Sequence, residues 1–194
     1  MDSIGTKRGL SPVRYEIDPS PSRFSVQAFA TGLLSAFGHN PSIAIRDYQG
    51  SIEFVPETFE KAYVKVIVQT HRMEVLDEMK RDDRQKLEQE MYGKVLDVER
   101  YPTAVFESQE ISVQKLDADL LQVRVAGELS FHGVTRSEVL EARAASMDST
   151  LRVSGNFTLR QSDYGIKPVS FAGGALRLKD ELKFKFELIA RRQE

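Results

Sequence analysis

The sequence predicts an all-β protein with one short helix, in which an antiparallel sheet closes into a barrel. Apolar and polar residues alternate with a period of two through most of the chain, which is typical of strands with one buried and one solvent-facing side. Strand-like segments do not alternate with helical ones, so a parallel α/β fold is disfavoured. A single sheet of about eight or more strands would leave exposed edges, and closure into a barrel removes them.

The chain of 194 residues is long enough to bury one large core. Its net charge is −2, whereas a nucleic-acid-binding domain would be strongly basic, so we expect no nucleic-acid partner. The absence of cysteine excludes disulfides, thiolate metal sites and cysteine nucleophiles. No signal peptide precedes the first strand and no apolar run approaches the ~18 residues of a transmembrane helix, so we expect a cytoplasmic protein without a transmembrane segment.

The strands are predicted from alternation and from the turn residues between them. The clearest alternation runs through Ala62–Gln69, Leu121–His132, Leu151–Arg160 and Leu182–Leu188. Shorter strand segments are Arg14–Asp18, Arg23–Phe29, Ile43–Arg46, Ser51–Val55, Ala104–Ser108, Ile111–Gln114 and Glu138–Arg143. Turn signals separate them at Asp18–Pro21, Gln49–Gly50, Val55–Glu57 and Asp117–Asp119.

One segment, Asp82–Gly93, is rich in helix-forming residues. Asp82 or Asp83 is placed to cap its N-terminus, and Gly93 is placed to end it. Leu87 and Met91 are four residues apart and form a narrow apolar stripe, which predicts a helix that lies against another part of the molecule.

The domain organisation predicted is a frayed segment over residues 1–13 followed by a single domain over residues 14–194. The loop Gly32–Pro41 is unusual because Leu33, Leu34 and Phe37 are apolar although they lie between strands. We expect this loop to pack over one end of the barrel, either as a plug or as a gate with Phe37 against the ligand.

The residues that could carry catalysis do not form a local pattern. His39, His71 and His132 are too far apart in sequence for a local metal pair, and His132 falls on the solvent face of its strand. No G-x-S-x-G sequence is present to hold a nucleophilic serine. We therefore predict no catalytic residue, no metal and no cofactor, and keep a metal-dependent enzyme that uses His39 or His132 as an alternative.

Seven short motifs, in order, carry a resemblance to a known family. They begin at Tyr15–Pro19 and Ser22–Val26, continue through Gly50–Phe54, Arg81–Asp82 with Leu96–Val98, and Tyr101–Ser108, and end at Gly127–Thr135 and Leu159–Ile166. The last two are similar to the patterns G-x-L-x-x-H-G-V-T and R-x-x-D-[FY]-G-I. Over roughly residues 14–191 the chain resembles the YceI-like family, also called the polyisoprenoid-binding domain family.

The resemblance implies a lipocalin-like, eight-stranded antiparallel barrel with a helix between two strands. It also implies an interior that in some members holds a long isoprenoid or amphiphile, and often a homodimer. The residues expected to contact such a ligand lie on the apolar faces of the strands and in the Gly32–Pro41 loop. They are Leu34, Phe37, Val66, Phe106, Val125, Leu129, Phe131, Phe157, Phe184 and Phe186.

The energetics of burial indicate what kind of ligand such an interior would favour. A buried methylene contributes about 0.8 kcal/mol, whereas association costs roughly 4–15 kcal/mol. About five carbons would barely bind, and about twenty would contribute about 16 kcal/mol. The prediction is therefore non-catalytic binding of an isoprenoid, a quinone-like molecule or a fatty amphiphile. The alternative is a packed, ligand-free barrel that acts as an interaction or dimer module, because the same side chains would also fill a core.

Overall fold

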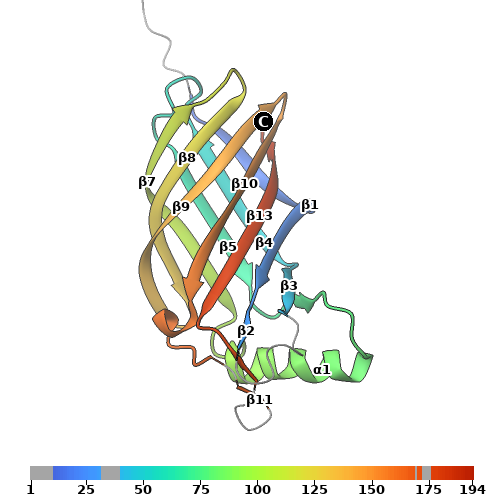
Figure 1. The fold of residues 1–194 in the computed structure, drawn as a ribbon. Coiled ribbons are helices and arrows are strands. Elements are labelled where there is room, and N and C mark those ends of the chain that lie inside the picture. Colours follow the sequence, from blue (N-terminus) through green and yellow to red (C-terminus); the bar gives the residue numbers. More distant parts are fainter. Residues whose placement is uncertain (1–10, 32–39, 169, 172–175) are drawn as a thin grey trace, which may run out of the picture.

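The barrel is closed by eight antiparallel strands, as predicted (Figure 1). The computed structural model describes residues 11–31, 40–168, 170–171 and 176–194. The barrel strands are β1 (Val13–Gln27), β4 (Tyr48–Phe54), β5 (Tyr63–Gln69), β7 (Thr103–Lys115), β8 (Leu120–Phe131), β9 (Val134–Met147), β10 (Thr150–Arg160) and β13 (Glu181–Arg192). Each pairs with the next in this order, and β13 returns to pair with β1, so the barrel has no free edge.

The remaining elements gather at the lower end of the barrel in Figure 1. They are β2 (Ala30–Thr31), β3 (Ser42–Ile45), β6 (Met73–Val75), α1 (Arg81–Glu90), the π-helical turn η1 (Met91–Val95), the 3₁₀ turn η2 (Gln161–Tyr164), β11 (Ser170–Phe171) and β12 (Leu176–Leu178). β3 and β6 extend the sheet outward from the second half of β1, while β2, β11 and β12 form a small separate sheet.

The turn predicted at Asp18–Pro21 is wrong, because β1 continues through it as one long strand. Its register against β13 shifts between Asp18 and Arg23, which marks an irregularity of the bulge type. The Ser22 hydroxyl donates to the Asp18 carbonyl oxygen at 2.6 Å and accepts from the Ile189 amide at 2.8 Å. Pro19 and Pro21 have no amide hydrogen to donate. The Ser22 side chain therefore replaces backbone hydrogen bonds between β1 and β13 at this point.

The turn predicted at Gln49–Gly50 is also wrong, because both residues lie inside β4. A Cβ atom on Gly50 would lie 2.5 Å from the carbonyl oxygen of Lys65, so this glycine serves a close approach of two strands. The segments Ala104–Ser108 and Ile111–Gln114 likewise belong to one strand, β7, which is bulged between Ser108 and Glu110. The loops at Val55–Glu57 and Asp117–Asp119 are confirmed.

The helix forms where it is predicted, but both of its ends differ. It begins at Arg81 after Lys80, with no side-chain cap, and Asp82 and Asp83 lie inside the first turn, where the helix dipole favours acidic residues. Gly93 does not end the helix, because the chain passes into η1. The Leu96 amide donates to the Met91 carbonyl at 2.9 Å, and both of these side chains are buried.

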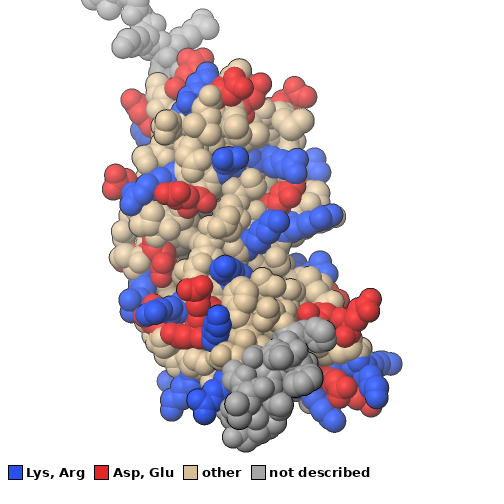
Figure 2. All heavy atoms as spheres, in the orientation of Figure 1, with Lys and Arg blue, Asp and Glu red and all other residues tan. Residues whose placement is uncertain are grey.

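Charged side chains of both signs are interspersed over the face of the barrel shown in Figure 2. Exposed ion pairs cross between neighbouring strands, such as Lys65–Glu107 at 3.2 Å and Arg191–Asp18 at 2.7 Å. Such pairs each contribute little to stability. Within the described part of the chain, no helix has both the length and the apolar character needed to cross a membrane.

Candidate functional site: the barrel interior

The interior of the barrel contains a cavity of about 320 Å³. This is at the lower end of the range found for small-molecule sites. Eight of the ten residues predicted to contact a ligand line it, namely Val66, Phe106, Val125, Leu129, Phe131, Phe157, Phe184 and Phe186. Leu34 and Phe37 lie outside the described residues. The structure thus places the strand residues of the prediction around one cavity.

The pleat of the strands explains why alternate residues line the cavity. On β8, Val123, Val125 and Leu129 face inward, and Val125 lies opposite Leu140 of β9 in the strand register. Lining residues come from both ends of β8, from Leu121 to Phe131, so the cavity extends along the barrel. An interior of this shape suits an elongated molecule.

Four phenylalanines form an aromatic wall on β1, β10 and β13. The rings of Phe157 and Phe184 stack with centroids 4.7 Å apart, and Phe24 lies 6.4 Å from both Phe184 and Phe186. Such ring pairs add to the stability that burial provides. Phe24 was missed as a site residue, although it shares one face of the predicted strand Arg23–Phe29 with Val26, which is buried.

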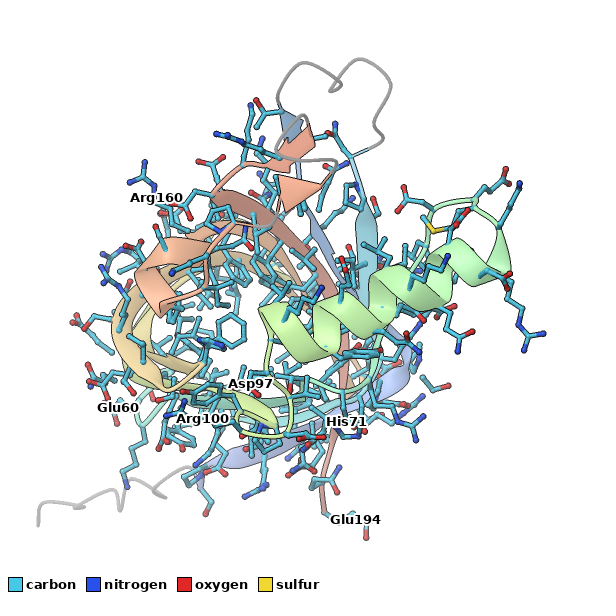
Figure 3. The ribbon with its side chains drawn as sticks, turned by 90° about the horizontal axis from the view of Figure 1, so that it is seen from below. Glu60, His71, Asp97, Arg100, Arg160 and Glu194 are labelled. Atoms are coloured by element: carbon cyan, nitrogen blue, oxygen red, sulfur yellow. The ribbon has the colours of Figure 1, made fainter. Side chains whose placement is uncertain are left out.

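The helix α1 and the turn η1 lie across part of the lower end of the barrel, as the view from below shows (Figure 3). The predicted stripe of Leu87 and Met91 faces the cavity, and Val95 of η1 lines it too. The helix is held to β6, because the Val75 amide donates to a Glu88 carboxylate oxygen at 3.1 Å and the Tyr92 hydroxyl donates to the carbonyl of β6 residue Met73. The sequence predicted that this helix would lie against another part of the molecule, but it did not predict that the helix would line the cavity.

The segment predicted to gate the interior, Gly32–Pro41, falls mostly outside the described residues. Its flanks are held together, since the Ala28 amide donates to the Pro41 carbonyl at 3.0 Å and the Ala30 amide to the Asn40 side chain at 3.0 Å. Pro41 lines the cavity. Gating stays a prediction.

The polar residues of the lining are few. Among the described residues, they are Glu53, Glu90, Glu138 and Gln161, and no lysine or arginine lines the cavity. Two of these carboxylates pair with exposed cations, Glu53 with Arg14 at 2.9 Å and Glu90 with Lys94 at 2.9 Å. Glu138 instead accepts a hydrogen bond of 2.6 Å from the hydroxyl of Tyr164.

Tyr164 contacts both Glu138 and His132. Tyr164 is 1% exposed, and its carbonyl oxygen lies 3.1 Å from Nδ1 of His132. His132 was expected on the solvent face of a strand, but it sits in the two-residue β8–β9 turn with Gly133, where both residues have positive φ. Its ring packs 4.4 Å from that of Tyr101. The turn therefore uses His132 for packing and a backbone contact.

The remaining histidines do not gather with it. His71 is exposed in the turn after β5, and His39 lies outside the described residues. Within the described ranges, no three His, Cys, Asp or Glu residues come close enough to hold a metal ion.

Replacing Tyr164 by phenylalanine should destabilise the protein and change its response to alkali. Burial, followed by the hydrogen bond to Glu138, raises the pKa of Tyr164 above its ordinary value, so the folded protein keeps a proton that the unfolded chain loses above about pH 10. This contribution to stability is complete below that pH and declines as the pH rises beyond it. We expect Tyr164→Phe to cost about 1–3 kcal/mol at neutral pH and to lose less stability between about pH 10 and 11. Urea unfolding at each pH measures both effects, and equal alkaline losses in the two proteins would contradict the assignment.

The comparisons with known proteins agree with this architecture. A model of the YceI-like domain matches residues 15–190. A UPF0312 protein of Pseudomonas aeruginosa strain LESB58 is 28% identical over 127 residues, which are 62% of this chain and 61% of that protein, so the match spans less than two thirds of the relative.

Solved structures show the same fold at low sequence identity. A polyisoprenoid binding domain from Saccharophagus degradans superposes with a TM-score of 0.68 at 12% identity, covering 92% of this chain and 98% of that one. BcnA of Burkholderia cenocepacia gives 0.67 at 16% identity, covering 89% and 98%. The YCEI protein of Campylobacter jejuni gives 0.62 at 18% identity, covering 81% and 88%. Since the domain model spans nearly the whole barrel, the chain belongs to the YceI-like family.

Proposed function

We propose that this protein binds a long apolar molecule inside the barrel without transforming it. The observation that carries the proposal is the cavity of about 320 Å³, which extends along the barrel and is lined almost entirely by aliphatic and aromatic side chains. The ligand class is an isoprenoid, a quinone-like molecule or a fatty amphiphile.

The length of the cavity supports a long ligand over a short one. The residues of β8 that line the cavity run from Leu121 to Phe131, and at the usual rise and tilt of barrel strands this span corresponds to about 25 Å along the axis. A chain that fills this distance buries many methylenes, each contributing about 0.8 kcal/mol, and overcomes the cost of association. A short molecule would leave most of the lining uncovered.

Two further observations support binding rather than catalysis. One structural neighbour, from Saccharophagus degradans, is named as a polyisoprenoid binding domain. In this chain, the ring of His132 is engaged by Tyr101 and the Tyr164 carbonyl, and the cavity lining holds no histidine among the described residues. The open interior favours this function over a packed, ligand-free barrel. A homodimer and a cytoplasmic location stay predictions.

The proposal is tested by native mass spectrometry of protein purified without detergent. We expect a mass adduct that solvent extraction identifies as a long-chain lipid, and we expect delipidated protein to take up a polyprenol with one-to-one stoichiometry. A short-chain prenol offered at the same concentration serves as the control and should not bind. A ligand-free mass together with no uptake of either probe would overturn the proposal.

A further inference from the structure

The charges that line the cavity are all of one sign. Within the described residues, Glu53, Glu90 and Glu138 are the charged members of the lining. Glu53 and Glu90 have cationic partners that stand in solvent, with Arg14 54% and Lys94 77% exposed. Their negative charge is therefore compensated outside the cavity.

Among the described residues, Glu138 is the lining carboxylate that forms no ion pair. It lies on the inward face of β9, in register with Gly127, and is followed on that face by the cavity-lining residues Leu140 and Ala142. Among the described residues, the neutral hydroxyl of Tyr164 donates a hydrogen bond of 2.6 Å to one of its carboxylate oxygens, Oε1. The nearby Arg136 does not line the cavity, and its guanidinium lies 3.7 Å from Asp163.

This arrangement orients the carboxylate as a hydrogen-bond acceptor. Tyr164 is almost fully buried, so its hydroxyl is held in place and can only stabilise Glu138 by donating to it. Another polar residue of the lining, Gln161, donates one of the two hydrogens of its amide nitrogen to the Lys179 carbonyl at 2.9 Å. Beside Glu138, the described residues of the lining therefore offer a carboxylate acceptor and no cation to a ligand.

We propose that Glu138 binds the polar end of the ligand and selects long-chain molecules whose end donates a hydrogen bond, such as a hydroxyl or an amine, over those that end in a carboxylate or phosphate. The proposal rests on the binding function above and names the chemistry of the ligand's polar end. A hydroxyl can donate to the second carboxylate oxygen of Glu138, and hydrogen bonds to charged groups are stronger than those between neutral groups. A second anion at the same place would be repelled with little screening, because the surroundings are apolar.

Two lysines outside the cavity offer an alternative place for the polar end of the ligand, and they would favour the opposite order of affinities. Lys179 and Lys183 lie outside the cavity, with their ammonium groups 6.0 Å and 5.3 Å from the centre of the Phe29 ring. If the ligand's polar end were held at these lysines, acids would bind better than alcohols. The order of affinities within one chain length therefore distinguishes an end at Glu138 from an end at these lysines.

The experiment measures the affinities of delipidated protein for three probes that share one isoprenoid chain: geranylgeraniol, its methyl ether and geranylgeranoic acid. We expect the methyl ether and the acid each to bind about tenfold or more weakly than the alcohol, because one cannot donate and the other is an anion. In Glu138→Gln, the gap between alcohol and acid should shrink to within about threefold, as the charge is removed while the shape is kept. Glu90→Gln is the matched control, since it removes another lining carboxylate and should leave the order unchanged.

The outcomes separate this proposal from the one on which it rests. If all three probes bind equally, or the acid binds best, Glu138 does not hold the polar end, although the barrel still binds apolar chains. If Glu138→Gln and Glu90→Gln change the order equally, the selectivity comes from the net charge of the interior and the assignment to Glu138 is overturned. If no probe binds the wild-type protein, both proposals fail. Thermal unfolding of each variant confirms that it is folded before binding is compared.

Discussion

Gly127→Ala is expected to destabilise the barrel by about 3 kcal/mol, although it adds a single methyl group. A Cβ atom at this position would lie 2.3 Å from the carbonyl oxygen of Glu107 and 2.9 Å from the Phe106 ring. The first of these is backbone next to the β7 bulge, so it cannot move away as the end of a flexible side chain would. For a chain of this length, the melting temperature should fall by about 6–12 °C.

The same substitution at Gly93 is the control. Nothing lies within 4 Å of a Cβ atom there, and the residue sits in the helical turn η1, where alanine is favoured over glycine. We expect Gly93→Ala to be neutral or to stabilise by up to about 1 kcal/mol. Calorimetry of the two variants measures the difference, and similar melting temperatures would show that the strands around Gly127 can separate at little cost.

Val125→Phe is expected to reduce the affinity for a long apolar ligand by about a thousandfold while leaving the fold intact. Val125 is buried at the middle of β8, lines the cavity and is paired in register with Leu140 of the adjacent strand β9. A phenyl ring there occupies space that would otherwise hold ligand. Displacing about five methylenes removes about 4 kcal/mol of binding free energy.

The matched control places the same change on the outside of the barrel. Val139 lies on the neighbouring strand, β9, is 48% exposed and is absent from the cavity lining. Val139→Phe should leave affinity unchanged. Because the new ring of Val125→Phe enters existing space, its unfolding free energy should stay within about 1 kcal/mol of the wild type. Titration of delipidated protein with a polyprenol measures both variants, and wild-type affinity in Val125→Phe would place the ligand elsewhere.

The fold and the inward faces of the strands could be predicted from the sequence because both follow from local periodicity. Side chains alternate across a strand, so the alternation around Val125 and Phe157 already sorts interior from exterior. The motifs Gly127–Thr135 and Leu159–Ile166 indicated the family, and the family resemblance implied the number of strands. The ligand-contacting roles of these residues stay predictions.

What the tertiary structure decided depends on contacts between residues far apart in sequence. Local turn signals at Asp18–Pro21 and Gln49–Gly50 were overridden, because the barrel continues its pairing by using the Ser22 hydroxyl and the missing side chain of Gly50. The size of the cavity, its partial cover by α1 and the bond between Glu138 and Tyr164 arise only once the barrel has closed. Alternation records which side of a strand avoids water, but whether the enclosed side chains meet or leave space is set by the diameter and tilt of the closed barrel.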